Sequence, residues 1–84
     1  MNIRQTIRQY ILQNFLFTDD EYALVDGDSF LAGGIIDSTG ILEIMYFVEE
    51  SFGITVNEDE MLPENLDSVD RLVAFVARKQ TVAA

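Results

Sequence analysis

The sequence contains no cysteine and no histidine, and these two absences narrow the possible chemistry. Without cysteine, the chain can form neither a disulfide framework nor a thiolate zinc site. Without histidine, it lacks the commonest general base and the commonest metal ligand, which removes most hydrolase and zinc-enzyme functions. We therefore expect a protein that is not an enzyme and that has no metal site.

Positive charge is also scarce, with five basic against fifteen acidic residues and a net charge of −10. Such a surface repels nucleic-acid phosphates and anionic membranes, and it attracts partners that carry Lys/Arg patches. No apolar run approaches the roughly 20 residues that a membrane helix needs, and residues 1–5 lack the apolar core of a signal peptide. We expect a cytoplasmic protein that neither binds nucleic acid nor inserts into membranes.

The 84 residues, 49% of them hydrophobic, are enough for one small domain over 1–80, followed by a flexible tail over 81–84. An apolar residue at every fourth position predicts a first amphipathic helix. Asn2 is its expected N-cap, with Gln5 as capping-box partner, Arg4 and Arg8 on the outer face, and an end near 18–20. The stripe consists of Ile3, Ile7, Ile11 and Phe15.

A long loop over 18–37 separates this helix from the second, which we expect from Ser38 to Phe52. Asp37 is the natural N-cap of the second helix, and Gly53 is the natural left-handed residue after its end. So long a loop in a small domain needs anchoring by its own side chains. The apolar loop residues available for this are Phe30, Leu31, Ile35 and Ile36.

The remaining chain predicts two more helices. Pro63 opens a short one that ends at Leu66, and Asp67 is expected to cap the last helix, whose apolar stripe contains Leu72 and Val76. The segment 54–56 has no evident partner strand and is expected to be a loop. The predicted fold class is therefore all-α: a small, irregular four-helix bundle with three longer helices, one short helix and a long first loop.

Ser38 is the most informative residue because it follows a Gly-Gly-Ile-Ile-Asp run and begins the second helix. A helix N-terminus offers a positive dipole end and free N–H groups, so a phosphodiester on this serine would be stabilised. Ile44 and Val48 lie on the core face of the helix. The opposite arc collects Ser38, Thr39, Leu42, Glu43, Tyr46, Glu49 and Glu50. Two large apolar side chains among carboxylates are typical of a transient docking surface.

Other candidate sites have simpler interpretations. The acidic residues of 19–28 do not follow the spacing of a calcium-binding loop, and those of 57–60 form a solvated loop. Asp67-Ser68 is a second Asp-Ser pair, but it lacks the preceding glycines. We interpret it as structural, with Asp67 as the helix cap.

The stretch 31–38, continued by Leu42-Glu43 and by 49–54, resembles the acyl carrier protein family, which includes peptidyl and D-alanyl carrier proteins. The resemblance implies that a phosphopantetheinyl transferase moves 4′-phosphopantetheine from coenzyme A onto Ser38, with Asp37 as the motif acid. The terminal thiol of this arm would hold acyl or aminoacyl groups as thioesters. Many fatty-acid carriers have leucine after the serine, whereas Thr39 and Gly40 make this motif more similar to those of D-alanyl and other stand-alone carriers loaded by adenylate-forming ligases.

The resemblance also implies a set of partners. They are the transferase, an acyl- or aminoacyl-adenylating ligase, and a downstream acyltransferase or synthase of fatty-acid or secondary-metabolite biosynthesis. A basic surface on these enzymes would meet the acidic arc of a monomeric carrier. Two alternatives stay open: an acidic helical interaction module without a cofactor, which binds a basic partner, and a regulatory domain phosphorylated on Ser38.

Overall fold

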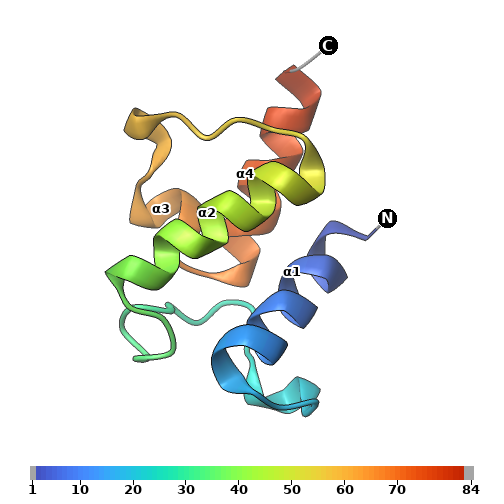
Figure 1. Cartoon of the computed structure of the whole chain (residues 1–84), viewed down its shortest axis with the longest axis vertical. Helices are drawn as coiled ribbons and strands as arrows, with labels where there is room; N and C mark the ends of the chain where they lie inside the picture. The colour runs from blue at the N-terminus through green and yellow to red at the C-terminus, as the bar shows by residue number, and fades with distance from the viewer. Residues whose placement is uncertain (1, 83–84) are drawn as a thin grey trace.

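The computed structural model describes residues 2–82, and no strand is present within this range. Three longer helices, α1 (Ile3–Ile11), α2 (Ser38–Phe52) and α4 (Val69–Val82), pack around one core, and the short α3 (Pro63–Leu66) lies between α2 and α4 in the chain. In Figure 1, the long first loop runs below α1 and α2, and α4 crosses behind α2. The predicted all-α fold with a long first loop is confirmed.

The core is a single cluster of aliphatic and aromatic side chains drawn from every long helix and from the first loop. Phe30 and Ile36 of the loop are almost fully buried, as predicted, whereas Leu31 is 42% exposed. The other fully buried side chains are Ile7, Ile11, Leu12, Ile44, Val48, Leu66, Val69, Leu72, Phe75 and Val76. Loop burial of this kind holds the chain that leads into α2.

The first helix begins as predicted, because the Asn2 side chain accepts a hydrogen bond from Gln5 N at 3.1 Å. Its end differs from the expectation. After Ile11 the chain continues as a π-helical turn over Leu12–Leu16, and Phe17 takes a left-handed conformation with φ of 53°. The Leu12 carbonyl accepts hydrogen bonds from Phe17 N and Thr18 N, which closes the helix end.

The prediction that Arg8 lies on the outer face is wrong, whereas the Arg4 side chain, 41% exposed, lies at the surface as expected. The Arg8 side chain is only 11% exposed, and its guanidinium donates to the Leu24 carbonyl at 2.9 Å and to the Asp26 carboxylate. Arg4 lies between Asp26 and Asp70, at 2.7 and 2.6 Å. Apolar periodicity identified the buried stripe of α1, but these long side chains bend along the surface to reach loop carboxylates.

Three further predictions concern the chain after α2. The short helix runs from Pro63 to Leu66, as expected, and 54–57 is an extended loop without strand pairing. The backbone of α4 continues through Val82, and residues 83–84 of the expected tail lie outside the described range. The flexible tail over 81–84 therefore stays a prediction.

Candidate functional site

The site is built around the first turn of α2, where Ser38 is the first helical residue and is exposed to solvent. Asp37 adopts an extended conformation, and its Oδ1 accepts from Gly40 N at 2.8 Å, which confirms it as the N-cap. The Asp37 carbonyl accepts from Ile41 N at 3.1 Å. Within the described residues, the amides of Ser38 and Thr39 have no protein acceptor, so this helix end presents free N–H groups next to the Ser38 hydroxyl.

The loop before Ser38 turns back on itself through a glycine. Gly34 has φ of 71°, a left-handed conformation that glycine adopts at little cost. The amides of Ile35 and Ile36 then both donate to the Phe30 carbonyl, at 3.0 and 3.3 Å. Because Phe30 and Ile36 are buried, this turn delivers Asp37 to the start of α2 from a fixed position.

Gly40 allows the first turn of α2 to pack closely on the loop and on the end of the first helix. A Cβ at this position would lie 2.5 Å from Ile36 Cγ2 and 3.0 Å from Phe15 Cε1. The glycine of the Asp-Ser-x-Gly sequence is thus explained by packing. With any larger residue at position 40, either the first turn of α2 or the side chains of Ile36 and Phe15 would have to shift.

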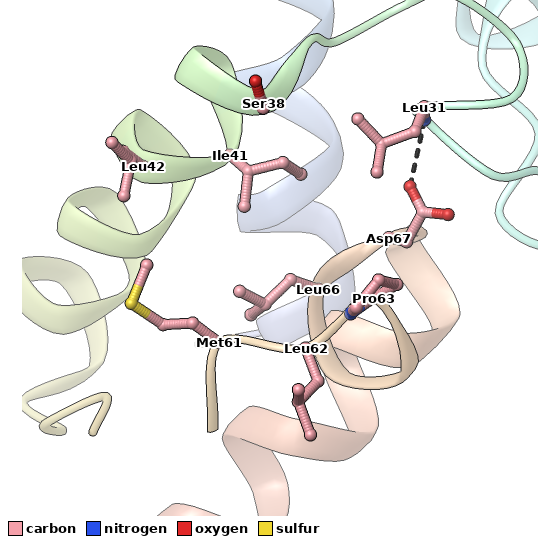
Figure 2. Close-up of a pocket in the computed structure, with 9 residues that line it drawn as sticks. All are labelled: Leu31, Ser38, Ile41, Leu42, Met61, Leu62, Pro63, Leu66 and Asp67. Carbon is pink, nitrogen blue, oxygen red and sulfur yellow. Dashed lines mark hydrogen bonds between the residues drawn. The ribbon is translucent and has the colours of Figure 1, made fainter. Parts of the chain in front are cut away.

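A cavity of about 240 Å³ opens beside Ser38, between α2 and α3. Figure 2 shows Ser38 and Leu42 on the α2 side and Leu62 and Pro63 on the opposite side, with Asp67 near the loop residue Leu31. The complete lining is Leu31, Ser38, Ile41, Leu42, Met61, Leu62, Pro63, Leu66 and Asp67. The attachment candidate therefore lies at the edge of an apolar hollow.

Asp67 is the only acidic residue of this lining, and it does not cap α4 as predicted. Its Oδ1 accepts from Leu31 N at 2.9 Å and its Oδ2 accepts from the Ser29 hydroxyl, while its carbonyl accepts from Phe30 N at 2.9 Å. The cap of α4 is Ser68, whose Oγ accepts from Arg71 N at 3.1 Å. Asp67 instead holds the first loop against α3, so its carboxylate is already committed to structure.

The second Asp-Ser pair is therefore no rival as a modification site. Ser68 is 3% exposed and accepts a hydrogen bond as a cap, whereas Ser38 is exposed. The structural interpretation of this pair is supported, but the cap is Ser68 and not Asp67, which was the expected cap. The local pattern could not show this, because both Asp and Ser are good caps and the two residues are adjacent in the sequence.

The residues of the predicted docking arc of α2 border two different hollows, and one of them also has a structural role. Leu42 borders the cavity beside Ser38, whereas Glu43, Tyr46 and Glu50 border a groove on the α1 side. These four side chains and Thr39 are exposed. Glu49 is half-buried and its Oε2 accepts from Val56 N at 2.8 Å, so this carboxylate anchors the following loop as well as facing the groove.

Two kinds of site were not expected from the sequence: a metal site and a membrane-spanning helix. No three acidic side chains in residues 2–82 gather closely enough to hold a metal ion. None of the helices in this range combines the length and the apolar character that crossing a bilayer requires.

Comparison with known proteins assigns the class of protein that this fold and this site define. No protein-family profile matches the chain. Two curated relatives named D-alanyl carrier protein, from two strains of Streptococcus suis, are 32% and 30% identical to it over 76 residues. Each match covers 90% of this chain and 92% of the relative. The chain belongs to the carrier protein family.

Proposed function

We propose that this protein carries acyl or aminoacyl groups on a 4′-phosphopantetheine arm attached to the Oγ of Ser38. The observation that carries the proposal is the exposed Ser38 hydroxyl at the Asp37-capped N-terminus of α2, in a chain related to carrier proteins. The arm, when attached, supplies a terminal thiol that holds the cargo as a thioester. A chain with no cysteine would gain its thiol chemistry in this way.

The residues around Ser38 fit an attached phosphodiester. Free amides of Ser38 and Thr39 and the positive end of the α2 dipole favour an anion at this position. Asp37 keeps its carboxylate on Gly40 N, which holds the first turn and leaves the Ser38 hydroxyl toward solvent. The protein itself then acts as a substrate shuttle and not as an enzyme, because its one carboxylate beside the cavity, Asp67, is held by loop hydrogen bonds.

The cargo and partners follow from the same proposal. Relatives named D-alanyl carrier protein, together with the Asp37-to-Gly40 sequence, favour a small aminoacyl cargo loaded by an adenylate-forming ligase. A phosphopantetheinyl transferase would modify Ser38, and a downstream acyltransferase or synthase would receive the cargo. We propose that each partner enzyme uses a basic surface of its own to contact Thr39, Leu42 and the acidic arc of α2. The carrier acts as a cytoplasmic monomer.

The test is to co-express the chain with a phosphopantetheinyl transferase of broad specificity and to measure the intact mass. We expect wild type and Ser68→Ala to gain one phosphopantetheine group and Ser38→Ala to gain none. Absence of any gain in wild type would contradict the carrier function, and a gain that survives Ser38→Ala would contradict the site. A gain of a single phosphate on Ser38 would indicate a phosphorylated regulatory domain instead.

A further inference from the structure

Asp67 joins the first loop to the junction between α3 and α4 through three hydrogen bonds. The residue is 7% exposed, and its carboxylate accepts from Leu31 N at 2.9 Å and from the Ser29 hydroxyl. Figure 2 shows the bond to Leu31 as a dashed line. The Asp67 carbonyl accepts the third bond, from Phe30 N at 2.9 Å. We call these three bonds the Asp67 clamp, because one residue holds three consecutive residues of the loop.

The loop side of the Asp67 clamp is a closed turn. The Ser29 hydroxyl donates to Asp67, and the same oxygen accepts from Ala32 N at 3.0 Å. The Ser29 carbonyl accepts from Gly33 N, also at 3.0 Å. The Ser29 side chain is thus used as a donor and as an acceptor at once. Residues 29–33 are therefore held by the Asp67 carboxylate as one unit.

The turn over 29–33 is linked to the first turn of α2 through a short series of contacts. The Phe30 carbonyl accepts from Ile35 N and Ile36 N, at 3.0 and 3.3 Å. Ile36 is buried, and it lies so close to Gly40 that a Cβ there would be 2.5 Å from Ile36 Cγ2. The position of Phe30 therefore determines the position of Ile36. Ile36 in turn packs on the helical turn that carries Ser38.

The clamp provides all the hydrogen bonds that tie segment 29–36 to other parts of the chain. Among the described residues, Asp67 is the only hydrogen-bond partner of this segment outside the segment itself. Burial of Phe30 and Ile36 also holds the segment, but apolar contacts are not directional, whereas a hydrogen bond restricts distance and angle. The ion pairs of the first loop lie earlier in the chain, at Glu21 and Asp26. The placement of 29–36 therefore depends on the clamp.

We propose that Asp67 is a positioning residue, which acts through segment 29–36 to hold Ser38 in the place where a modifying enzyme binds it. That Ser38 is modified rests on the proposed function, but the linkage from Asp67 to the first turn of α2 does not. When the clamp is weakened, only a fraction of the chains presents Ser38 in this place, and the apparent affinity of the enzyme falls by that fraction. The chemical step of the bound chain is unchanged, so KM rises and kcat does not fall.

The first measurement is amide hydrogen exchange on the unmodified chain, which does not depend on the proposed function. Ser29→Ala removes one bond of the clamp and leaves the Asp67 carboxylate its other donor. We expect exchange to accelerate about fivefold, the effect of one lost hydrogen bond, at amides that the variant does not touch. These amides are those of Ile35, Ile36 and Gly40.

The matched control is Ser68→Ala, which removes the cap of α4 directly beside Asp67 but no bond of the clamp. Rates are compared with that of Val48 N, in the middle of α2, which reports unfolding of the whole helix. Relative to Val48, Ser68→Ala should leave the amides of 35, 36 and 40 unchanged. Equal rates at these amides in Ser29→Ala and wild type, or equal acceleration in Ser29→Ala and Ser68→Ala, would overturn the linkage.

The second measurement is steady-state modification by a phosphopantetheinyl transferase, with the concentration of the carrier varied. Ser29→Ala should raise KM about fivefold and change kcat less than about twofold. Asp67→Ala, which removes two bonds, should raise KM further. Asp67→Asn keeps an acceptor for Leu31 N and can donate to the Ser29 oxygen, so KM should stay within about twofold of wild type. Ser68→Ala should keep the KM of wild type.

The two measurements separate this inference from the proposed function. A fall in kcat with unchanged KM in Ser29→Ala, or the same rise in KM in Ser29→Ala and Ser68→Ala, would refute the positioning role. A KM for Asp67→Asn as high as that for Asp67→Ala would also contradict it. If wild type is not modified at all, the proposed function fails, and with it the role of Asp67 toward an enzyme. The exchange rates then still decide whether Asp67 holds the first turn of α2.

Discussion

Asp37-Ser38 and Asp67-Ser68 are the same dipeptide in two places, each at the start of a long helix. In the first pair the aspartate is the cap and the serine begins α2. In the second pair the serine is the cap and α4 begins one residue later, at Val69. The shift of one residue decides which side chain is used to cap the helix and which is left for another role.

The residue that does not cap differs most between the two pairs. Ser38, freed by Asp37, is exposed and borders an open cavity, which suits a modification site. Asp67, freed by Ser68, is 7% exposed and bridges to Ser29 and Leu31 of the first loop. An Asp-Ser motif alone therefore does not predict an attachment site. The two pairs differ in the position of the helix start relative to the serine and in the exposure of that serine.

The largest expected difference in stability is between the two aspartates. Asp67→Ala removes a buried acceptor of two hydrogen bonds and leaves their donors without a partner, so we expect a loss of about 2–3 kcal/mol in the free energy of unfolding. Asp37→Ala removes one exposed cap and should cost about 1 kcal/mol. Urea denaturation followed by circular dichroism measures both. Asp19→Ala, at an exposed loop position, is the control. Equal losses for Asp37→Ala and Asp67→Ala would contradict the different roles assigned to the two aspartates.

Replacing the two serines should also lower the free energy of unfolding by different amounts. The loss should again be greater in the second pair, but the difference should be smaller than for the aspartates. Ser68→Ala removes the cap of α4 and should cost about 1 kcal/mol in the free energy of unfolding. Ser38→Ala changes an exposed first-turn residue and should stay within about 0.5 kcal/mol of wild type. The same urea experiment applies. A large loss for Ser38→Ala would show that its hydroxyl has a structural role. Absence of modification in that variant could then result from unfolding and not from loss of the attachment site.

The features predicted correctly from the sequence are those with local causes. Both ends of α2 were predicted at the observed residues, because a cap such as Asp37 and a left-handed glycine such as Gly53 act within one helical turn. Pro63 marks the short helix for the same reason. The position of Ser38 as the first residue of α2 follows from the same local signals. The attachment candidate was therefore accessible to prediction before any tertiary structure was known.

The features predicted wrongly or missed depend on partners far away in the chain. Asp67 pairs with Leu31, 36 positions earlier, and Arg8 pairs with Asp26, 18 positions later. A carboxylate beside a helix start can cap that helix or accept hydrogen bonds from residues distant in the sequence. The apolar pattern of the sequence does not show which of the two occurs. The close contact that requires Gly40, with Ile36 and Phe15, likewise exists only in the folded chain.

The surroundings of the second pair also predict a dependence on pH. Asp70 follows this pair in α4, its N–H donates to the Asp26 carbonyl at 3.0 Å, and Arg4 joins the two carboxylates. Burial opposes ionisation of Asp26, but hydrogen bonds from Arg8 and Arg4 outweigh it and hold the pKa of this carboxyl below its ordinary value. The ionised group therefore stabilises the fold above its ordinary pKa, and this contribution is lost as pH falls through the lower, folded-state pKa.

We expect the free energy of unfolding to decrease from about pH 5 downward, since ordinary aspartate pKa values lie near 4. Asp26→Asn should flatten this decrease because the variant cannot ionise, and Asp28→Asn, a nearby substitution at an exposed position, should not. Urea titrations between neutral pH and pH 3 measure the slope. Amide exchange at pH 4 then measures the protection of the two helix starts separately. Residues around Ser68, which depend on the Asp26 contacts, should lose protection before those around Ser38, which do not. An identical slope for wild type and Asp26→Asn would show that these ion pairs do not hold the loop.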